Sequence, residues 1–246
     1  DMTFHCINNA ETHQMVLTGT GDIQLSVLCA KLKDRFGVDV TLAPARVPYR
    51  EKIRKKVKVE GKHKKQSGGH GQYGHVWIEF EPCDSEELEK GLRESVQRGV
   101  LAGYPVVYLK ATLVDGSYHP VDSSEMAFKT AASLAYKAGL AQANPVLLEP
   151  IGELHVMVPD SYTGDVMGDL NKRRGRVMGM NPMEDGEQEI IAEVPMGEMG
   201  TYAIDLRSMT QGRGVFTYAF LRYEDAPPAV QEKAIAEAKQ MQGDEQ

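Results

Sequence analysis

The spacing of apolar residues at the start of the chain predicts one helix between short strands. Strands are expected at 3–7, 14–18 and 38–42, and a helix is expected at 22–36. The apolar face of this helix is expected to contain Ile23, Val27, Leu28 and Leu32. Gly37 follows directly, at the position where glycine commonly ends a helix. This order is the last two-thirds of a βαββαβ unit, so we expect residues 1–45 to be a partial ferredoxin-like domain that lacks its first strand and helix.

The middle of the chain alternates apolar and polar residues over two stretches, which a glycine-rich connection separates. The alternation includes Val57 and Val59 before the connection, and Val76, Ile78 and Phe80 after it. This pattern predicts a hairpin with a long connection, and such connections in compact domains are often functional. A short helix at 92–98 and a strand at 106–113 are expected to follow.

A longer helix is predicted from about Asp122 to Leu140. Asp122 is followed three positions later by Glu125, a spacing that fits a capping box. Small and apolar residues recur along one side of this helix and are expected to pack closely on a sheet. These residues are Ala127, Ala131, Leu134 and Ala138. The preceding loop, 115–121, is therefore expected to be held between a strand end and a helix start.

A complete βαββαβ pattern covers residues 151–225. Strands are expected at 152–158, 176–180, 188–194 and 215–223, with helices at 162–174 and 196–208. The buried face of the second helix is expected to include Met196, Met199, Ala203 and Leu206. After Pro227 and Pro228 a last helix is predicted at 229–240. The whole pattern indicates a multidomain α+β protein.

Composition changes this picture chiefly through charge. The 246 residues are 41% apolar and carry a net charge of −7, but Arg50 to Lys65 contains nine Lys and Arg against Glu51 and Glu60. This asymmetry is expected to create a local attraction for phosphate groups. The three cysteines are far apart, which indicates neither a disulfide framework nor a zinc ribbon. With no signal peptide or membrane-spanning run visible, we expect a cytoplasmic location and no membrane partner.

Two loops carry the candidate chemistry, QSGGHGQYGHV at 66–76 and the loop at 115–121. The glycines allow a phosphate cradle, but a P-loop would need GxxxxGK followed by Ser or Thr at a helix start, which is not the pattern here. Acid/base catalysis by His70 and His119 is a second hypothesis. Contact with nucleic acid is a third, because close backbone approach, polar side chains and a basic strand all suit RNA.

Several motifs in order resemble the C-terminal half of bacterial elongation factor G. They are QSGGHGQYGHV, DGSYHPVDSSEMAFK, GDVMGDLNKRRGRVMGM and DLRSMTQGRGVF. The resemblance extends over nearly the whole chain, from GTGDIQLSVLCAKLKDRFGVDV through PARVPYRE to the last helix. One such motif would be a weak signal, whereas several in the same order are a strong one.

The resemblance implies part of a translational GTPase. Residues 1–45 are similar to the remainder of domain III, 46–150 to domain IV, which has a ribosomal-protein-like α+β fold, and 151–225 to ferredoxin-like domain V. Residues 226–246 are similar to the helix that packs on domain IV and the tail after it. The resemblance implies no catalytic residue, metal or cofactor in this fragment, with GTP and magnesium bound by a G domain outside it. It implies a monomer whose partners are the ribosome, with its rRNA and proteins, and tRNA and mRNA in the decoding region.

Site residues are implied by matching the family motifs to this chain. The tip that enters the decoding region and supports translocation corresponds to the loops at 66–74 and 115–121. Its contact residues are Gln66, Ser67, Gly68, Gly69, His70, Gly71, Gln72, Ser117, Tyr118 and His119. The basic strand before the first loop adds a patch for RNA backbone, made of Lys56, Lys58, Lys62, Lys64 and Lys65.

The chain departs from the family pattern at three places. His70 stands where arginine is usual, and Pro120 stands where an acidic residue is usual. Between Pro82 and Gly91 the chain lacks the strand and helix start that the family usually has. These departures indicate a paralogue, and they leave a ribosome-protection or rescue factor without translocase activity as an alternative to a translocating factor.

Overall fold

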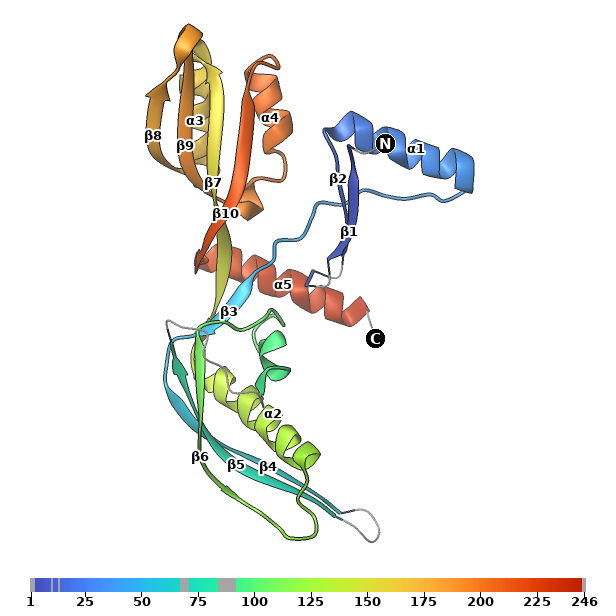
Figure 1. The fold of residues 1–246 in the computed structure, drawn as a ribbon, viewed down its shortest axis with the longest axis vertical. Helices are drawn as coiled ribbons and strands as arrows, with labels where there is room; N and C mark the ends of the chain where they lie inside the picture. Colours follow the sequence, from blue (N-terminus) through green and yellow to red (C-terminus); the bar gives the residue numbers. More distant parts are fainter. Residues whose placement is uncertain (1–2, 10, 13, 67–70, 84–91, 245–246) are drawn as a thin grey trace. The chain divides into compact units, whose positions relative to one another are not determined.

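The computed structural model describes residues 3–9, 11–12, 14–66, 71–83 and 92–244, with side chains up to residue 240. The chain forms two compact units (Figure 1). Unit 1 comprises residues 1–48 and 149–224, and unit 2 comprises residues 49–148 and 225–246. The sequence prediction of a mixed α and β multidomain fold is confirmed.

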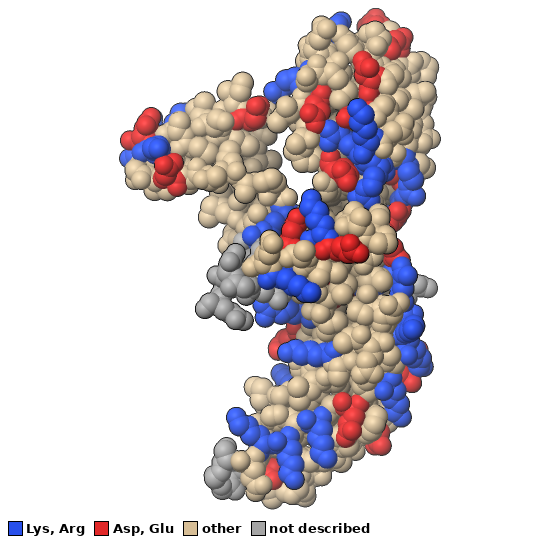
Figure 2. Space-filling view, turned by 180° about the vertical axis from the view of Figure 1, so that it is seen from behind, with Lys and Arg blue, Asp and Glu red and all other residues tan. Residues whose placement is uncertain are grey.

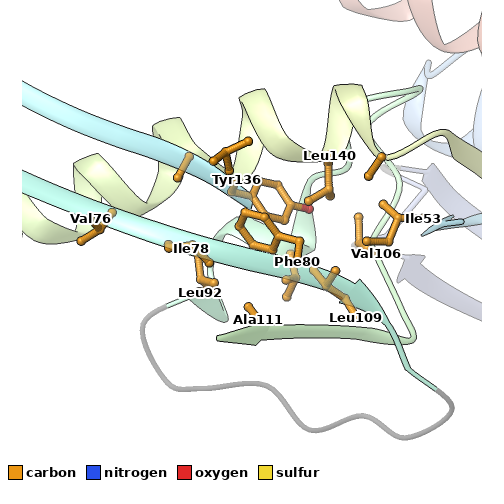
Figure 3. Close-up of a cluster of buried hydrophobic side chains, with 14 of the residues drawn as sticks. Ile53, Val76, Ile78, Phe80, Leu92, Val106, Leu109, Ala111, Tyr136 and Leu140 are labelled. Atoms are coloured by element: carbon orange, nitrogen blue, oxygen red, sulfur yellow. The ribbon is translucent and has the colours of Figure 1, made fainter. Parts of the chain in front are cut away.

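Unit 2 is built on an antiparallel sheet in the order β4-β5-β6, with strands Val57–Gln66, Gly71–Pro82 and Leu109–Ser117. Helix α2 (Glu125–Gln142) packs on one face of this sheet. As predicted from the alternation, Val76, Ile78 and Phe80 are buried, and they belong to the same core as Tyr136 and Leu140, which Figure 3 shows. The ring centroids of Phe80 and Tyr136 lie 6.1 Å apart in an edge-to-face arrangement, a favourable geometry for aromatic pairs.

Helix α2 lies unusually close to the hairpin because glycines face it. A Cβ atom at Gly61 would lie 2.1 Å from the carbonyl oxygen of Ala131, and one at Gly74 would lie 2.2 Å from that of Ala127. Both distances are far below van der Waals contact with a backbone atom, so only glycine fits at these two strand positions. The small residues of the helix and the glycines of the sheet therefore form one close contact.

At the other end of unit 2, a buried carboxylate holds a loop. Strand β3 (Arg50–Ile53) pairs with the first residues of β7 (Pro145–Pro159), and it contains Glu51, which is 1% exposed. The carboxylate of Glu51 accepts hydrogen bonds from the amides of residues 101–104, at 2.8 to 3.2 Å. Burial raises the pKa of Glu51, and these four amide donors oppose that rise.

Helix α5 (Pro228–Asp244) completes unit 2. Its residue Ala234 is buried together with Leu147 and Ala226. The amide of Ala226 donates to the carbonyl of Leu147 at 3.0 Å, and the Gln231 side chain accepts from the amide of Leu147. The helix is thus joined to the start of β7 by both apolar packing and hydrogen bonds.

Unit 1 contains a sheet in the order β10-β7-β9-β8, the strand order of a ferredoxin-like βαββαβ unit. Strand β8 is Arg176–Pro182, β9 is Glu187–Pro195 and β10 is Val215–Asp225. Helices α3 (Thr163–Lys172) and α4 (Tyr202–Met209) cover one face of the sheet. The buried core contains Leu154, Val156, Val158, Val166, Leu170, Ile190, Ala192, Val194, Tyr202 and Leu206.

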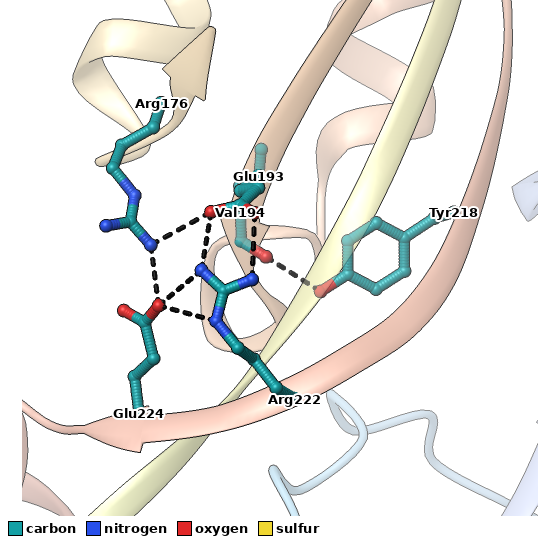
Figure 4. Close-up of polar contacts among 6 residues, drawn as sticks. All are labelled: Arg176, Glu193, Val194, Tyr218, Arg222 and Glu224. Carbon is teal, nitrogen blue, oxygen red and sulfur yellow. Dashed lines mark hydrogen bonds and ion pairs between the residues drawn. The ribbon is translucent and has the colours of Figure 1, made fainter. Parts of the chain in front are cut away.

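Charged side chains link three strands of unit 1 (Figure 4). Arg222 donates to both carboxylate oxygens of Glu193, at 2.8 and 2.7 Å, and Arg176 donates to Glu193 at 2.9 Å. Both arginines also contact Glu224. The hydrogen bonds from Arg222 are the main reason that the pKa of Glu193 is lowered, and the bidentate geometry is the strong form of this contact.

The N-terminal part of unit 1 contains strands β1 (His5–Asn9) and β2 (Gln14–Thr18) and helix α1 (Asp22–Phe36). The bounds of β2 and α1 match the prediction. The predicted apolar face of α1 is not buried, however, since Ile23 is 73% exposed and the helix has no buried residue. The short strands β1 and β2 bury no apolar core with the helix among the described residues, and residues 38–42 do not form the predicted strand.

Other differences arise where tertiary contacts override local patterns. Residues 95–97 form only a 3-10 turn, and the strand expected at 106–113 is displaced to β6. In α2, Leu134 is 45% exposed and Ala138 is also exposed, whereas Ala135 and Gly139 are buried. Ala203 is exposed in α4, because Tyr202 and Leu206 fill the buried side of that helix. Ala127, Ala131 and Leu206 are buried as predicted, so the predicted faces were correct in part and missed their neighbours by one position.

Substitution of Gly61 by alanine should destabilise unit 2. The added Cβ would clash with backbone of α2, and overpacking of this kind costs about 1–3 kcal/mol of unfolding free energy. Trp77, the single tryptophan of the chain, lies in β5 and reports on this unit by fluorescence during urea unfolding. The matched control is Gly168→Ala in α3 of unit 1, where a Cβ has open space. An unchanged urea midpoint for Gly61→Ala would contradict the close contact.

The stability of unit 1 should fall in acid partly through Glu193. Its pKa is lowered from 4.5 in the folded state, so the folded carboxylate binds a proton less readily than the unfolded one. The resulting stabilisation is present above the unfolded pKa and is lost as the pH falls through the folded pKa, below about pH 5. Glu193→Gln should therefore reduce the pH dependence of the urea midpoint, followed by the methyl NMR signals of buried Ile190. The exposed Glu184→Gln serves as the control, and equal pH dependence in both variants would refute the role of the network.

Candidate nucleic-acid interface

The end of the β4–β5 hairpin and the loop before α2 meet at one place in unit 2. Asp122 joins them, since its carboxylate oxygen Oδ1 accepts from the amide of Gly71 at 3.0 Å and its carbonyl accepts from the amide of Tyr73 at 2.8 Å. The hydroxyl of Ser123 donates to the carbonyl of Tyr73 at 3.0 Å. The two loops predicted to form one tip are therefore connected by hydrogen bonds in their described parts. Ser67, Gly68, Gly69 and His70 lie outside the described residues.

The role of Asp122 corrects the predicted helix cap. The N-cap of α2 is Ser124, whose hydroxyl accepts from the amide of Ala127 at 3.2 Å. Asp122 does not cap the helix, because its carboxylate contacts Gly71 instead. A Cβ at Gly71 would lie 3.0 Å from the carboxyl carbon of Asp122. The absence of a side chain at Gly71 therefore leaves room for this carboxylate.

His119 is held by the main chain of its own loop. Its amide donates to the hydroxyl of Ser123 at 2.8 Å, and its ring atom Nδ1 accepts from the amide of Asp122 at 3.2 Å. Its side chain is 51% exposed, and neighbouring Tyr118 is 69% exposed. The ring centroids of Tyr73 and His119 lie 6.2 Å apart. The tip thus presents two exposed aromatic side chains from a loop with defined backbone geometry.

Ser117 contributes to a chain of side-chain hydrogen bonds instead of standing alone at the tip. Its Oγ atom lies 2.6 Å from the hydroxyl of Tyr73 and 2.6 Å from Nδ1 of His75. The other ring nitrogen of His75 lies 2.8 Å from a carboxylate oxygen of Glu60. Sequence reasoning missed this group, because only the register between β4, β5 and β6 brings Glu60, His75 and Ser117 together.

This chain of contacts has the residue types of a serine nucleophile with a histidine base. It lies on exposed sheet surface, and the nearby Gly116 amide donates to Asp115 at 2.7 Å instead of to a position beside Ser117 Oγ. An oxyanion needs donors aimed at the reacting centre, so the geometry favours an ordering role over hydrolysis. The acid/base hypothesis on His70 and His119 stays untested, since His70 lies outside the described residues.

The remaining predicted contact residues differ in their partners. Gln72 contacts His63, with Oε1 of the glutamine 2.9 Å from Nε2 of the histidine, and Gln66 is exposed opposite Gly71 in the hairpin register. Gly71 and Gln72 are described residues of β5, so the sheet extends close to the tip. The described ends of β4 and β5 therefore stay paired up to Gln66 and Gly71.

All five predicted patch lysines are exposed or half-buried on β4 or just before it. Lys56 forms ion pairs with Glu79 at 2.5 Å and Glu81 at 3.2 Å, and the hydrogen bond to Glu79 is the first cause of its raised pKa. Among the described residues Lys62, Lys64 and Lys65 form no ion pair. Figure 2 shows blue Lys and Arg side chains gathered along the surface of unit 2. The positive charge available to a partner thus increases toward the tip.

Metal ligation and membrane insertion find no support among the described residues. In the part of the chain that the structure describes, no group of three or more His, Cys, Asp or Glu is placed to hold a metal ion. No described helix is both long and apolar enough to cross a membrane.

Comparison with known families matches three consecutive models to this chain. Residues 1–44 match elongation factor G domain III, residues 45–89 and 85–144 match elongation factor G domain IV, and residues 146–234 match the elongation factor G C-terminus. A crystal structure of a protein from Thermus thermophilus is similar to 98% of the chain, with 40% sequence identity and a TM-score of 0.90. The chain covers 39% of that protein's length.

Removing the Asp122 carboxylate should loosen the joint between the two loops. In Asp122→Ala the amide of Gly71 loses its acceptor, and a hydrogen bond to a charged group contributes about 1.5–3 kcal/mol, with the lower value expected at this partly exposed site. Amide exchange at Gly71, measured by NMR, should therefore accelerate by about tenfold. Asp122→Asn keeps an acceptor oxygen and is the matched control. Equal exchange in the alanine variant and the unsubstituted chain would show that the carboxylate does not join the loops.

Proposed function

The chain belongs to the elongation factor G family, and on that premise we propose that this part of a translation factor binds the ribosome through unit 2. The tip of unit 2 enters the decoding region of the small subunit and supports movement of tRNA and mRNA. The observation that carries this proposal is the joint at Asp122, which connects the described parts of the two loops. A tip that must occupy a defined space beside paired RNA requires such fixed geometry, because ordering it only upon binding would reduce affinity.

The contacts at the tip suit recognition of RNA by shape and stacking. Exposed Tyr118 and His119 offer ring surfaces for stacking. Hydrogen bonds to the loop hold the His119 ring in place, and a binding role of this kind involves no proton transfer. Lys62, Lys64 and Lys65 lie just behind and suit phosphate groups. We therefore assign the tip to binding and positioning, with no catalysis by this part of the protein.

The proposal extends to the whole factor. The intact protein would act in the cytoplasm as a monomer, and a G domain would bind GTP with magnesium and hydrolyse GTP. The described residues themselves would contact rRNA, ribosomal proteins, tRNA and mRNA. Joined to a GTPase half from the family, the chain should promote tRNA movement on programmed ribosomes if it serves translocation.

A ribosome-protection or rescue role is the alternative function, and two residues of the tip loops are the reason to consider it. His70 and Pro120 replace the arginine and acidic residue that are usual in the family, and both changes fall in the tip loops. A factor of this kind, with its GTPase half, would release a tetracycline-class drug from stalled ribosomes without moving tRNA. Measuring drug release and tRNA movement on the same ribosomes therefore separates the two functions.

Ribosome binding by this chain should weaken as salt rises, and the basic strand should contribute to the slope. Each neutralised phosphate adds about 0.7–0.9 to the slope of log affinity against log salt. The double variant Lys62→Gln, Lys64→Gln should thus lower the slope by about 1.4–1.8, measured by cosedimentation with small subunits. Lys137→Gln, on the exposed side of α2, is the control for loss of a lysine outside the strand. Equal slopes in the unsubstituted chain and both variants would mean that Lys62 and Lys64 contact water and no phosphate of the ribosome.

The tip itself is tested by His119→Ala. Because His119 is exposed, its substitution should change the unfolding free energy by no more than about 0.5 kcal/mol. Binding to small subunits should nevertheless weaken. An unchanged affinity would exclude His119 from the interface, whereas loss of folding would show that its role is structural.

A further inference from the structure

The face of the β4–β5–β6 sheet opposite α2 carries a row of aromatic side chains. Gly74, Val76, Ile78 and Phe80 of β5 face α2 or the core, so Tyr73, His75 and Trp77 occupy the other face of the same strand. The register places Lys58, Lys62 and Lys64 of β4 on this face as well. We call it the open face. The open face shares Lys62 and Lys64 with the basic strand of the proposed function, but its aromatic row lies outside the tip, so Trp77 tests it independently.

Hydrogen bonds order the rings of this row. The Ser117 hydroxyl lies 2.6 Å from both the Tyr73 hydroxyl and His75 Nδ1, and Glu60 contacts the other nitrogen of His75 at 2.8 Å. The side chain of His75 is only 17% exposed. Rings that are held before binding lose little conformational freedom when a flat ligand group stacks on them or beside them. The row is thus preorganised as a platform.

The charges around the platform favour an anionic ligand. Glu79 and Glu81 are neutralised by Lys56 and by Lys110, at 2.5 to 3.2 Å. Glu60 contacts His75, and the Asp115 carboxylate accepts from the amide of Gly116. Among the described residues, no acidic partner pairs with the lysines that follow β4 toward the tip. Basic groups therefore remain available beside the aromatic row while the acidic groups are engaged.

Trp77 and Lys58 show how a ligand would fit. The Lys58 ammonium lies 5.7 Å from the centroid of the Trp77 ring, within the range of a cation–π contact. Trp77 is half-buried, and a base that stacks on the ring face next to Lys58 would replace this ammonium there. Indole rings on open sheets stack well with unpaired bases of any sequence, and neighbouring cations bind the backbone phosphates.

We propose that the open face binds a single-stranded RNA segment, with one unpaired base stacked on Trp77 and the adjoining phosphates on Lys58 and Lys62. A duplex cannot offer such a base, because its bases are stacked on one another. The site recognises an unpaired stretch without strong sequence preference.

Trp77 is also the natural probe, since it is the single tryptophan of the chain. Titration of the full chain with oligouridylate or oligoadenylate of about eight nucleotides should quench its fluorescence saturably. An RNA duplex of equal length should quench it far less. Equal quenching by duplex and single strand would overturn the assignment of a stacked base.

Substitutions of Trp77 and Lys62 separate the contribution of base stacking to RNA affinity from that of charge. Stacking of one base contributes about 1–3 kcal/mol, so Trp77→Thr should weaken binding of a fluorescein-labelled oligouridylate by about 5- to 160-fold in anisotropy measurements. Trp77→Phe retains a ring and should recover most of the affinity. Lys62→Gln should lower the salt slope by about 0.7, while Lys137→Gln should have no effect. Far-UV circular dichroism checks the fold of each variant.

The outcomes keep this site apart from the tip. His119→Ala should leave oligonucleotide quenching of Trp77 unchanged even where it weakens ribosome binding. Unchanged oligonucleotide affinity in a folded Trp77→Thr variant would overturn the proposal, and so would binding of a peptide but no RNA at this face. Failure of the tip variants to affect ribosome binding would count against the proposed function alone.

Discussion

The contact between α2 and the β4–β5 hairpin is the constraint on which the candidate site depends. Gly61 and Gly74 let the helix backbone approach the strands so closely that no other residue fits there. The start of α2, capped by Ser124, is thereby fixed beside the end of the hairpin. Asp122, two residues before the cap, then reaches the amide of Gly71, and the two loops become one tip. Close packing in the unit thus determines the geometry of its surface.

Glu51 in unit 2 and Glu193 in unit 1 are both buried, but their partners differ. Glu51 in unit 2 is enclosed, and its desolvation is offset by four amide donors from one loop, so loss of the carboxylate would leave those amides unsatisfied. Glu193 in unit 1 lies in a network whose partner Arg222 is 41% exposed on its side chain. Exposed ion pairs typically contribute no more than about 1 kcal/mol, so the buried apolar residues of the unit 1 core dominate its stability. Glu51 holds the loop at 101–104, whereas the Glu193 network mainly makes the stability of unit 1 depend on pH.

The sequence predicted elements well where one local pattern was decisive. The bounds of α1, the alternating burial of β5 and the βαββαβ order of unit 1 all follow from periodicity and glycine placement. The cap of α2 was wrong because a residue of the right type, Asp122, contacts Gly71 across the tip instead. The Glu60, His75 and Ser117 contacts were missed for a related reason. β4 and β5 pair up to Gln66 and Gly71, so their connection is shorter than predicted, and β5 pairs with β6 through a bulge at Trp77 and Ile78. Such a register cannot be read from alternation alone.

The tip and the open face adjoin each other and share hydrogen-bonded residues. Ser117 belongs to the loop that the family motif assigns to the tip, yet its hydroxyl contacts Tyr73 and His75 of the open-face row. The amide of Tyr73 donates to the carbonyl of Asp122, and the carbonyl of Tyr73 accepts from the hydroxyl of Ser123. These hydrogen bonds are present before any ligand binds, so neither surface has to lose much conformational freedom at Ser117 or Tyr73 on binding. The position of α2, which Gly61 and Gly74 fix, holds Asp122 and Ser123 where they contact Tyr73, so the order of both surfaces depends on the same contact between helix and strands.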